Sequence, residues 1–214
     1  FSLEKNLFIK LINKNKLQAQ ILKEKKAPFL DIGVPKDLKK SPNLIKKFTK
    51  KPAVFLDRDG VINHDYGYVF EKKNFKLKKN VIKSIQYLNK KNIFVFIVTN
   101  QSGIGRGYYA EKHFFELSSF LKKKLLDENC HIDEIFFAPY FKNSKVAKYR
   151  KDAILRKPNA GMYHLAKKKW SIIQAKSLMI GDSESDMYFA KNANLKFIKV
   201  DDKSDLLKVV KKYY

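Results

Sequence analysis

The chain has 214 residues, of which 44% are hydrophobic, so it is long enough to bury the core of one ordinary domain. Its single cysteine, Cys130, excludes an internal disulfide and is typical of a reducing compartment. The apolar runs are too short to span a membrane, so we expect a cytoplasmic protein with no membrane partner.

The formal net charge of +25 is typical of nucleic-acid-binding proteins, but its distribution is not. Residues 1–52 carry 14 Lys and Arg residues against 4 acidic ones, and the remainder carries 32 against 17. The charge is therefore spread along the chain, and nearly all of it is lysine beside abundant Asn and Ile. A compositional bias explains this pattern, and we expect no nucleic-acid partner, although the charge would attract anionic substrates.

The first part of the chain is predicted to be a short appendage, residues 1–48. Residues 29–35 are typical of a strand that ends in a turn, and Pro35–Phe48 is typical of a helix interrupted near Pro42. Residues 49–52 are typical of a linker.

Strand and helix patterns alternate over the remaining residues, 53–214. Continuous apolar runs predict strands, and apolar residues spaced three and four apart predict helices. The expected strands are 53–56, 93–98, 134–137, 178–180 and 197–200. The expected helices are 80–91, 111–128, 160–170, 185–193 and 205–211. This order predicts right-handed crossovers and an α/β fold with a doubly wound, mostly parallel sheet.

Two carboxylates, Asp57 and Asp59, directly follow the first expected strand and precede Gly60. Open α/β sheets bind ligands at the carboxyl ends of their strands. There the first carboxylate can attack phosphorus, and the second can protonate a leaving group and then activate water. Asp and Gly also favour ordinary turns, so this segment alone leaves both interpretations open.

Two further segments carry groups that suit a phosphate. Thr99 and Asn100 end a strand and lead into a glycine-rich loop that contains Arg106. A hydroxyl and backbone N–H groups at a strand end can hold phosphate oxygens, and an arginine can pair with a second anion. Arg156 and Lys157 precede a helix, where a lysine can neutralise a transferred phosphoryl group. A plain loop and two solvated cations are the alternatives.

A fourth segment places Asp182 directly after another strand, with Asp186 four residues later. Asp182 would complete a Mg²⁺ site made of oxygen ligands. Asp186 would orient the loop, or would simply lie in the first turn of the next helix.

Four such segments in this order, each at a strand end, resemble the haloacid dehalogenase (HAD) phosphohydrolase superfamily, which has a Rossmann-like fold. Within it, the finer motifs resemble the D-glycero-D-manno-heptose 1,7-bisphosphate phosphatases and the related histidinol-phosphate phosphatases. These motifs are residues 55–60, Asn63, 67–69, 99–104 and 156–158. The resemblance covers roughly residues 53–201. It implies a Mg²⁺-dependent enzyme that removes the 7-phosphate of a heptose bisphosphate through an aspartyl-phosphate.

The resemblance also implies roles for single residues. Asp57 would be the nucleophile, Asp59 the general acid and then the base, and Thr99 and Lys157 would stabilise the phosphoryl group. The Asp57 side chain, the Asp59 backbone carbonyl and Asp182 would hold Mg²⁺. The residues expected to bind the sugar phosphate substrate are Asp65, Tyr66, Gly67, Tyr68, Asn100, Gln101, Ser102, Arg106, Arg156 and Ser183.

Two departures from the family pattern stand out. The family carries a structural zinc loop with three Cys and one His ligand, and the matching positions here are Ala138, Tyr140, Ala153 and Leu155. None of these can bind zinc, so we predict no zinc and a more mobile loop held by Phe141, Val146 and Tyr149. Ser183 stands where heptose enzymes have a lysine that contacts substrate, which weakens the substrate assignment but not the reaction class.

Residues 1–5 and 29–38 resemble the C-terminal end of a sugar-1-phosphate nucleotidyltransferase, in which the position of Asp31 can contribute to a metal site. The glycine-rich nucleotide-binding loop of such enzymes does not occur in this sequence, so we expect no nucleotidyl transfer by the chain itself. The segment is interpreted as the tail of a two-enzyme polypeptide cut upstream, whose other half would activate the heptose 1-phosphate product. Chance similarity in a lysine-rich tether is the alternative.

Three other functions stay open at this point. Histidinol-phosphate phosphatases share most of the motifs, but the N-terminal segment suggests no partner from that pathway. A polynucleotide 3′-phosphatase shares the aspartate pair and the Thr-Asn-Gln loop, and would bind DNA in a salt-sensitive manner. A non-catalytic HAD-like module is disfavoured by the intact Asp57, Asp59, Lys157 and Asp182.

Overall fold

The computed structural model describes residues 2–18, 31 and 33–214. Three residues of the strand expected over 29–35, namely 29, 30 and 32, lie outside this described part. The chain divides into two units, Phe1–Ile45 and Lys46–Tyr214.

The described part of the first unit contains three helical segments. The π-helix η1 (Leu3–Phe8) leads into α1 (Ile9–Asn13), and α2 (Pro35–Phe48) begins later in this unit. The expected interruption of α2 near Pro42 is wrong, because the helix continues through it. A proline lacks the N–H that would bond the carbonyl four residues earlier, here that of Leu38. The hydroxyl of Ser41 donates to this carbonyl at 2.7 Å, so the carbonyl keeps a donor.

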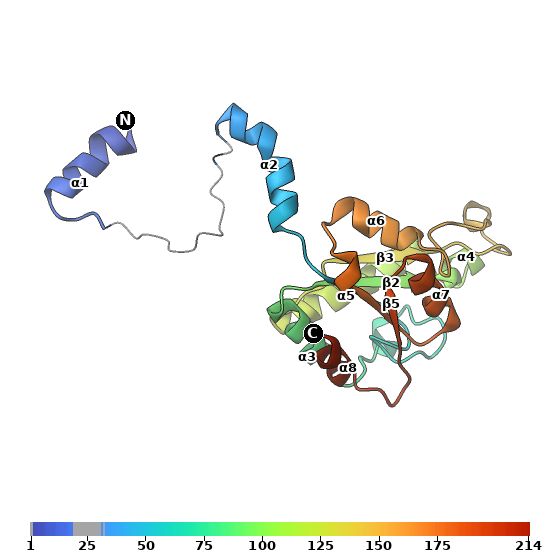
Figure 1. Ribbon diagram of the computed structural model, residues 1–214. Helices are drawn as coiled ribbons and strands as arrows, with labels where there is room; N and C mark the ends of the chain where they lie inside the picture. Colours follow the sequence, from blue (N-terminus) through green and yellow to red (C-terminus); the bar gives the residue numbers. More distant parts are fainter. Residues whose placement is uncertain (1, 19–30, 32) are drawn as a thin grey trace. The chain divides into compact units, whose positions relative to one another are not determined.

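Within the described part of the chain, the second unit contains one sheet of five parallel strands in the order β3-β2-β1-β4-β5 (Figure 1). The strands are β1 (Ala53–Leu56), β2 (Phe94–Asn100), β3 (Glu134–Ala138), β4 (Leu178–Gly181) and β5 (Lys196–Lys199). All four pairings between neighbouring strands are parallel. The predicted doubly wound parallel sheet is confirmed, and β1 lies at its centre.

The register aligns the carboxyl ends of the three central strands. Leu56 lies opposite Ile97 on β2 and Ile180 on β4. The backbone N–H of Asp57 then donates to the carbonyl of Ile180 at 3.1 Å, so the chain leaves β1 while it is still tied to β4. The residues that follow these strands are thereby brought to one edge of the sheet.

Helices pack on both faces of the sheet, as the apolar clusters show. One face is covered by α3 (Val81–Lys90), α5 (Glu111–Asp127) and α8 (Leu206–Tyr213), and the other by α6 (Gly161–Lys169) and α7 (Glu184–Asn192). The shorter elements are η2 (Lys72–Asn74), α4 (Ser102–Arg106), η3 (Ala147–Tyr149) and η4 (Gln174–Lys176). None of the helices that the structure describes combines the length and the apolar content needed to cross a bilayer.

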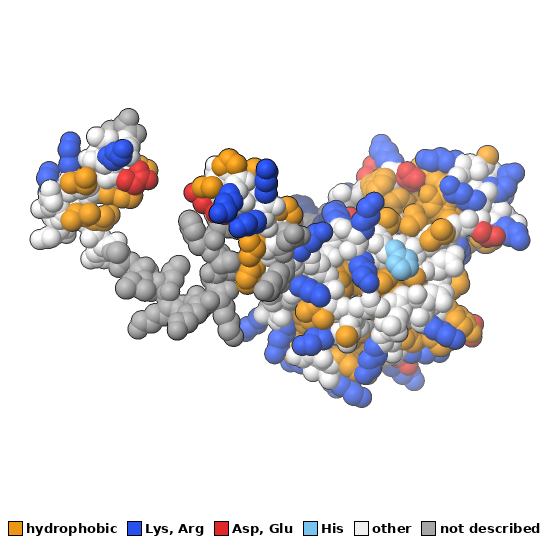
Figure 2. Space-filling view, turned by 45° about the horizontal axis from the view of Figure 1, so that its top comes forward, with side chains coloured by type: hydrophobic (Ala, Val, Ile, Leu, Met, Phe, Trp, Pro, Cys, Tyr) orange, Lys and Arg blue, Asp and Glu red, His pale blue; other side chains and the backbone are white. Residues whose placement is uncertain are grey.

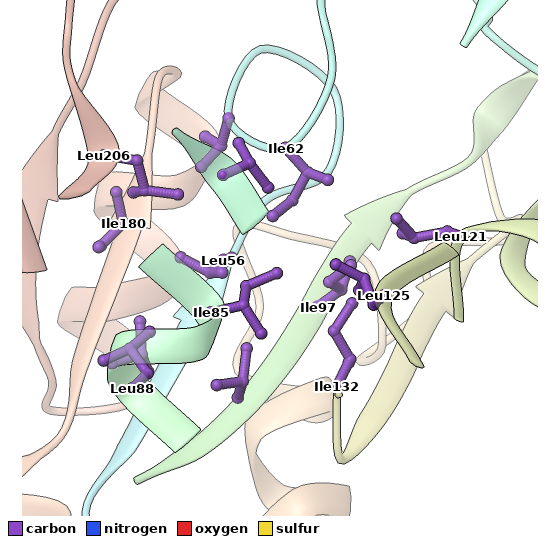
Figure 3. Close-up of a cluster of buried hydrophobic side chains, with 14 of the residues drawn as sticks. Leu56, Ile62, Ile85, Leu88, Ile97, Leu121, Leu125, Ile132, Ile180 and Leu206 are labelled. Atoms are coloured by element: carbon purple, nitrogen blue, oxygen red, sulfur yellow. The ribbon is translucent and has the colours of Figure 1, made fainter. Parts of the chain in front are cut away.

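Strand β1 is buried on both faces, because alternate side chains of a strand point in opposite directions. Val54 and Leu56 belong to the core with α3, α5 and α8, whereas Ala53 and Phe55 belong to the core with α6 and α7. Figure 3 shows the first of these cores, where Leu56 lies among side chains from the sheet and the helices. A strand buried on both faces gives the residues that follow it a rigid base.

Basic side chains are spread over the second unit. Figure 2 shows Lys and Arg side chains scattered across the visible face instead of gathered in one patch. This matches the even distribution of charge in the sequence.

Substitution of two neighbouring leucines on α5 tests which side of this helix packs into the core. Leu125 is 0% exposed and Leu126 is 64% exposed. We expect Leu125→Ala to lower the free energy of unfolding by about 2–5 kcal/mol, because it leaves a cavity. Leu126→Ala should change it by less than about 0.5 kcal/mol. Urea denaturation of both variants measures the difference, and equal losses would contradict the packing described here.

Candidate active site

The edge of the sheet at which β1, β2 and β4 end is hollowed by a cavity of about 330 Å³. Its lining residues are Asp57, Asp59, Asp65, Gly67, Tyr68, Thr99, Asn100, Gln101, Ser102, Tyr109, Lys157, Asp182, Ser183 and Ser185. The structure therefore brings together every predicted catalytic and metal-binding residue, although they come from four separate segments. Of the predicted substrate-binding residues, Tyr66, Arg106 and Arg156 are not among those that line the cavity.

A buried lysine lies between two carboxylates at the base of the cavity. The Nζ atom of Lys157 lies 2.9 Å from Oδ1 of Asp57 and 2.5 Å from Oδ1 of Asp186. Burial alone would lower the pKa of Lys157, but these carboxylates raise it above its ordinary value. Burial raises the pKa of the Asp57 carboxyl, and the Lys157 ammonium opposes this rise. Lys157 is thus held as a cation beside the predicted nucleophile.

Asp186 is fixed by the start of α7. Its Oδ2 accepts hydrogen bonds from the Ser183 backbone N–H at 3.1 Å and from the Ser183 hydroxyl at 2.6 Å. The backbone N–H of Asp186 donates in return to Oγ of Ser183 at 3.4 Å, which completes a capping box. Its Oδ1 accepts from Lys157. Asp186 therefore both lies in the first helical turn and orients the lysine.

A group of carboxylates in the cavity suits a hard cation. One oxygen each of Asp57, Asp182 and Asp186 lies within 4.8 Å of the other two. Both carboxylate oxygens of Asp186 already accept hydrogen bonds, Oδ1 from Lys157 and Oδ2 from Ser183, so Asp57 and Asp182 are the residues that could hold a cation. Oxygen-only donors of this kind fit Mg²⁺. Burial, followed by the charge of Asp186, raises the pKa of the Asp182 carboxyl.

Gly60 allows the loop that follows β1 to lie close to Asp182, which follows β4. Its φ is +82°, and a Cβ atom built on it would lie 1.9 Å from Oδ2 of Asp182. Any side chain at Gly60 would therefore displace the carboxylate of Asp182, in addition to straining the backbone.

The carboxylate of Asp59 accepts hydrogen bonds from three neighbouring side chains. Nη2 of Arg58 donates to its Oδ2 at 2.8 Å, Nδ2 of Asn63 donates to its Oδ1 at 2.9 Å, and Nε2 of Gln101 donates to its Oδ2 at 3.2 Å. Arg58 is itself only 3% exposed. Arg58 was not among the residues predicted from the sequence, although its place between the two aspartates was a signal that could have identified it.

Tyr109 is a second residue of the site that the sequence analysis missed. Its hydroxyl donates to Oε1 of Gln101 at 2.6 Å, and its ring stacks on Phe70. Nothing in the local pattern distinguishes this tyrosine from Tyr108, which is exposed. Only the folded chain shows which of the two enters the cavity.

Arg106 and Arg156 share one aromatic ring near the cavity. Their guanidinium carbons lie 3.9 Å and 5.7 Å from the centre of the Phe141 ring. Burial and the charge of Arg106 lower the pKa of Arg156, whereas Tyr68, which lines the cavity, raises it. Two cations are therefore concentrated beside Phe141. Tyr66, by contrast, is 60% exposed and stacks on His64.

The segment between Ala138 and Leu155, where the sequence predicted no zinc, is held by hydrogen bonds. The backbone N–H of Phe141 donates to the Tyr149 carbonyl at 3.1 Å, and that of Val146 donates to the Gly105 carbonyl at 3.0 Å. The hydroxyl of Tyr149 donates to Glu111 at 2.6 Å. The contacts expected of Phe141, Val146 and Tyr149 are present.

A family model described as a haloacid dehalogenase-like hydrolase matches residues 9–194. The chain belongs to this family. The D-glycero-beta-D-manno-heptose-1,7-bisphosphate 7-phosphatase of Haemophilus influenzae is 39% identical over 144 residues, which are 67% of this chain and 78% of that protein. The D-glycero-alpha-D-manno-heptose-1,7-bisphosphate 7-phosphatase of Burkholderia mallei is 38% identical over 146 residues, 68% of this chain and 77% of that protein.

Among solved structures, the D,D-heptose 1,7-bisphosphate phosphatase of B. bronchiseptica, complexed with magnesium and phosphate, shares the fold. It superposes with a TM-score of 0.63 at 22% identity, over 75% of this chain and 97% of that chain. The resemblance to the heptose bisphosphate phosphatases that the motifs predicted is confirmed by these relatives.

A pair of glycine substitutions tests the metal site. Gly60→Ala should weaken Mg²⁺ binding by about 10- to 100-fold, because its methyl group displaces Asp182. Gly107→Ala is the control, since Gly107 has a φ of +78° and a Cβ atom there would meet nothing closer than 3.9 Å. Both variants should lose about 1 kcal/mol of stability from the backbone strain. Titration calorimetry with Mg²⁺ measures the affinities, and equal affinities in the two variants would contradict the assignment.

Proposed function

We propose that this chain is a Mg²⁺-dependent phosphatase that hydrolyses the 7-phosphate of D-glycero-D-manno-heptose 1,7-bisphosphate. The observation that carries the proposal is the convergence of Asp57, Thr99, Lys157 and Asp182 on one cavity in a member of the hydrolase family. The named activity of relatives at 39% and 38% identity supports the substrate. These two relatives act on the two anomers, so the proposal covers both.

We assign the cation to the side chains of Asp57 and Asp182 and to the backbone carbonyl of Asp59. The magnesium in the B. bronchiseptica enzyme supports this choice of metal. Bound there, Mg²⁺ would offset the negative charge of the phosphoryl oxygens as the bond to phosphorus changes.

Asp57 supplies the nucleophile in this proposal. Its carboxylate oxygen forms a bond to phosphorus, while the bond between phosphorus and the sugar oxygen breaks. The Lys157 ammonium, 2.9 Å from Asp57, lies where it can neutralise charge on the transferred group. The hydroxyl of Thr99 accepts a hydrogen bond from Gln101 at 2.9 Å, so its own proton can be donated to a phosphoryl oxygen.

Asp59 is the general acid of the first step and the general base of the second. It protonates the departing sugar oxygen, and the carboxylate that remains takes a proton from the water that attacks the aspartyl-phosphate. Arg58, Asn63 and Gln101 keep its carboxyl group in place through both steps.

The sugar and the second phosphate occupy the rest of the site. A cavity of about 330 Å³ is within the range typical of small-molecule sites. We assign the sugar to the lining residues Asp65, Gly67, Tyr68, Asn100, Gln101, Ser102 and Ser183. Tyr66 is left out of this assignment, because it is exposed and does not line the cavity. We assign the 1-phosphate to Arg106 and Arg156, because paired guanidinium groups suit a phosphate that is not transferred.

Two further assignments belong to the proposal. The segment from Ala138 to Leu155 holds no zinc and relies on the contacts of Phe141 and Tyr149. Residues 1–48 form the end of a nucleotidyltransferase-like domain, joined through residues 49–52 to the phosphatase domain 53–214. Motif resemblance supports this second assignment, and a heptose 1-phosphate is the class of product that a nucleotidyltransferase consumes.

Phosphate release from a panel of substrates tests the proposal. With Mg²⁺, we expect efficient release from α- or β-heptose 1,7-bisphosphate, and little from histidinol phosphate or a 3′-phosphorylated oligonucleotide. Removal of the metal with EDTA should stop turnover, and added Mg²⁺ should restore it.

Asp57→Asn is the matched control for the panel, since it keeps the side-chain shape and loses the nucleophile. We expect its kcat to fall by at least about a thousandfold. Better turnover of histidinol phosphate or of the oligonucleotide would overturn the heptose assignment and keep the reaction class. Unchanged turnover in Asp57→Asn would overturn the mechanism itself.

A further inference from the structure

The buried amide of Gln101 has fixed partners at both ends. Gln101 is 2% exposed and Tyr109 is 6% exposed, so solvent does not compete for these groups. The Tyr109 hydroxyl donates to Oε1 at 2.6 Å. Nε2 donates to Asp59 at 3.2 Å and to Thr99 at 2.9 Å. The amide therefore connects Tyr109 to two of the groups that act on the phosphate.

The Tyr109 hydroxyl acts as a donor in this arrangement. Burial raises the pKa of the Tyr109 phenol above its ordinary value, against the opposing charge of Arg58, so the hydroxyl keeps its proton. Stacking of its ring on Phe70, with centres 4.7 Å apart, holds the side chain in place. A donor in this position selects the oxygen end of the amide and turns the nitrogen end toward Asp59.

We infer that Tyr109 is a positioning residue, whose hydroxyl holds the Gln101 amide in the orientation that leaves the Asp59 proton available to the departing oxygen. This inference rests on the proposed function, in which Asp59 is the general acid. In the observed orientation Nε2 donates to Asp59 in either protonation state, because a protonated carboxyl oxygen still accepts. In the reverse orientation Oε1 would accept the Asp59 proton, and the Thr99 proton as well, and would hold both back from the substrate.

The effect of the Tyr109 hydroxyl on the rate should depend on the leaving group of the substrate. As Asp57 forms its bond to phosphorus, the ester oxygen departs with the electron pair of the bond that breaks and takes the Asp59 proton. An aliphatic alkoxide needs this proton, whereas p-nitrophenolate is stable enough to leave as an anion. A defect confined to proton delivery therefore slows alkyl phosphates and spares p-nitrophenyl phosphate.

Tyr109→Phe tests the inference, with kcat/KM measured for a primary hexose phosphate and for p-nitrophenyl phosphate. This ratio reports the steps up to the first phosphoryl transfer. We expect a loss of about tenfold for the hexose phosphate and of less than about twofold for p-nitrophenyl phosphate.

Tyr163→Phe is the matched control. The Tyr163 hydroxyl is also buried, and the described part of the chain offers it no hydrogen-bond partner. It lies on α6 and does not line the cavity. We expect both values of kcat/KM to stay unchanged in this variant.

Equal losses for the two esters in Tyr109→Phe would overturn the inference, since the tyrosine would then support the cavity in general. A double-mutant cycle with Gln101→Leu gives a second test. Tyr109→Phe should cause no further loss in that background, and an additive loss would show that it does not act through Gln101.

The same experiment separates this inference from the proposed function. Activity on both esters without activity on heptose bisphosphate would remove the proposed substrate and leave the inference intact. Heptose bisphosphate is therefore measured as a third substrate, and a wild-type chain inactive on all three would contradict the proposed reaction, and the inference with it.

Discussion

The ion pairs of the buried Lys157 are the interaction on which the rest of the site depends. An ammonium that is almost fully buried needs compensating charge, and Asp57 and Asp186 provide it from two different elements. Each carboxylate in turn accepts a hydrogen bond from the backbone, Asp57 from the N–H of Arg58 and Asp186 from the N–H of Ser183 at the start of α7. Removing either carboxylate leaves a buried charge underpaired, so the arrangement constrains all of these residues at once.

The topology of the sheet explains how segments far apart in sequence meet. β1 lies between β2 and β4, and the parallel register aligns the ends of all three strands. Each strand is followed by a segment whose polar groups line the same cavity. Because the helices pack on both faces, this edge is where the groups of the sheet remain open to a substrate.

Much of this could be predicted from the sequence. Asp57, Thr99 and Asp182 each follow a continuous apolar run, and such runs are the clearest sign of a buried parallel strand.

Tyr109 could not be predicted, because its role comes from a contact with Gln101 that only the folded chain creates. The interruption of α2 at Pro42 was predicted wrongly for a similar reason, since the Ser41 hydroxyl compensates for the N–H that Pro42 lacks. The common contact of Arg106 and Arg156 with Phe141 likewise depends on the shape of a loop.

The mechanism depends on covalent phosphorylation of Asp57, and chemical trapping of the aspartyl-phosphate is its sharpest test. Borohydride reduces an aspartyl-phosphate to homoserine, which mass spectrometry of the digested protein locates in the sequence. During turnover of heptose 1,7-bisphosphate, we expect homoserine at Asp57, dependent on both substrate and Mg²⁺. Homoserine at Asp59 or Asp182 instead, or an unmodified Asp57 during rapid turnover, would contradict it.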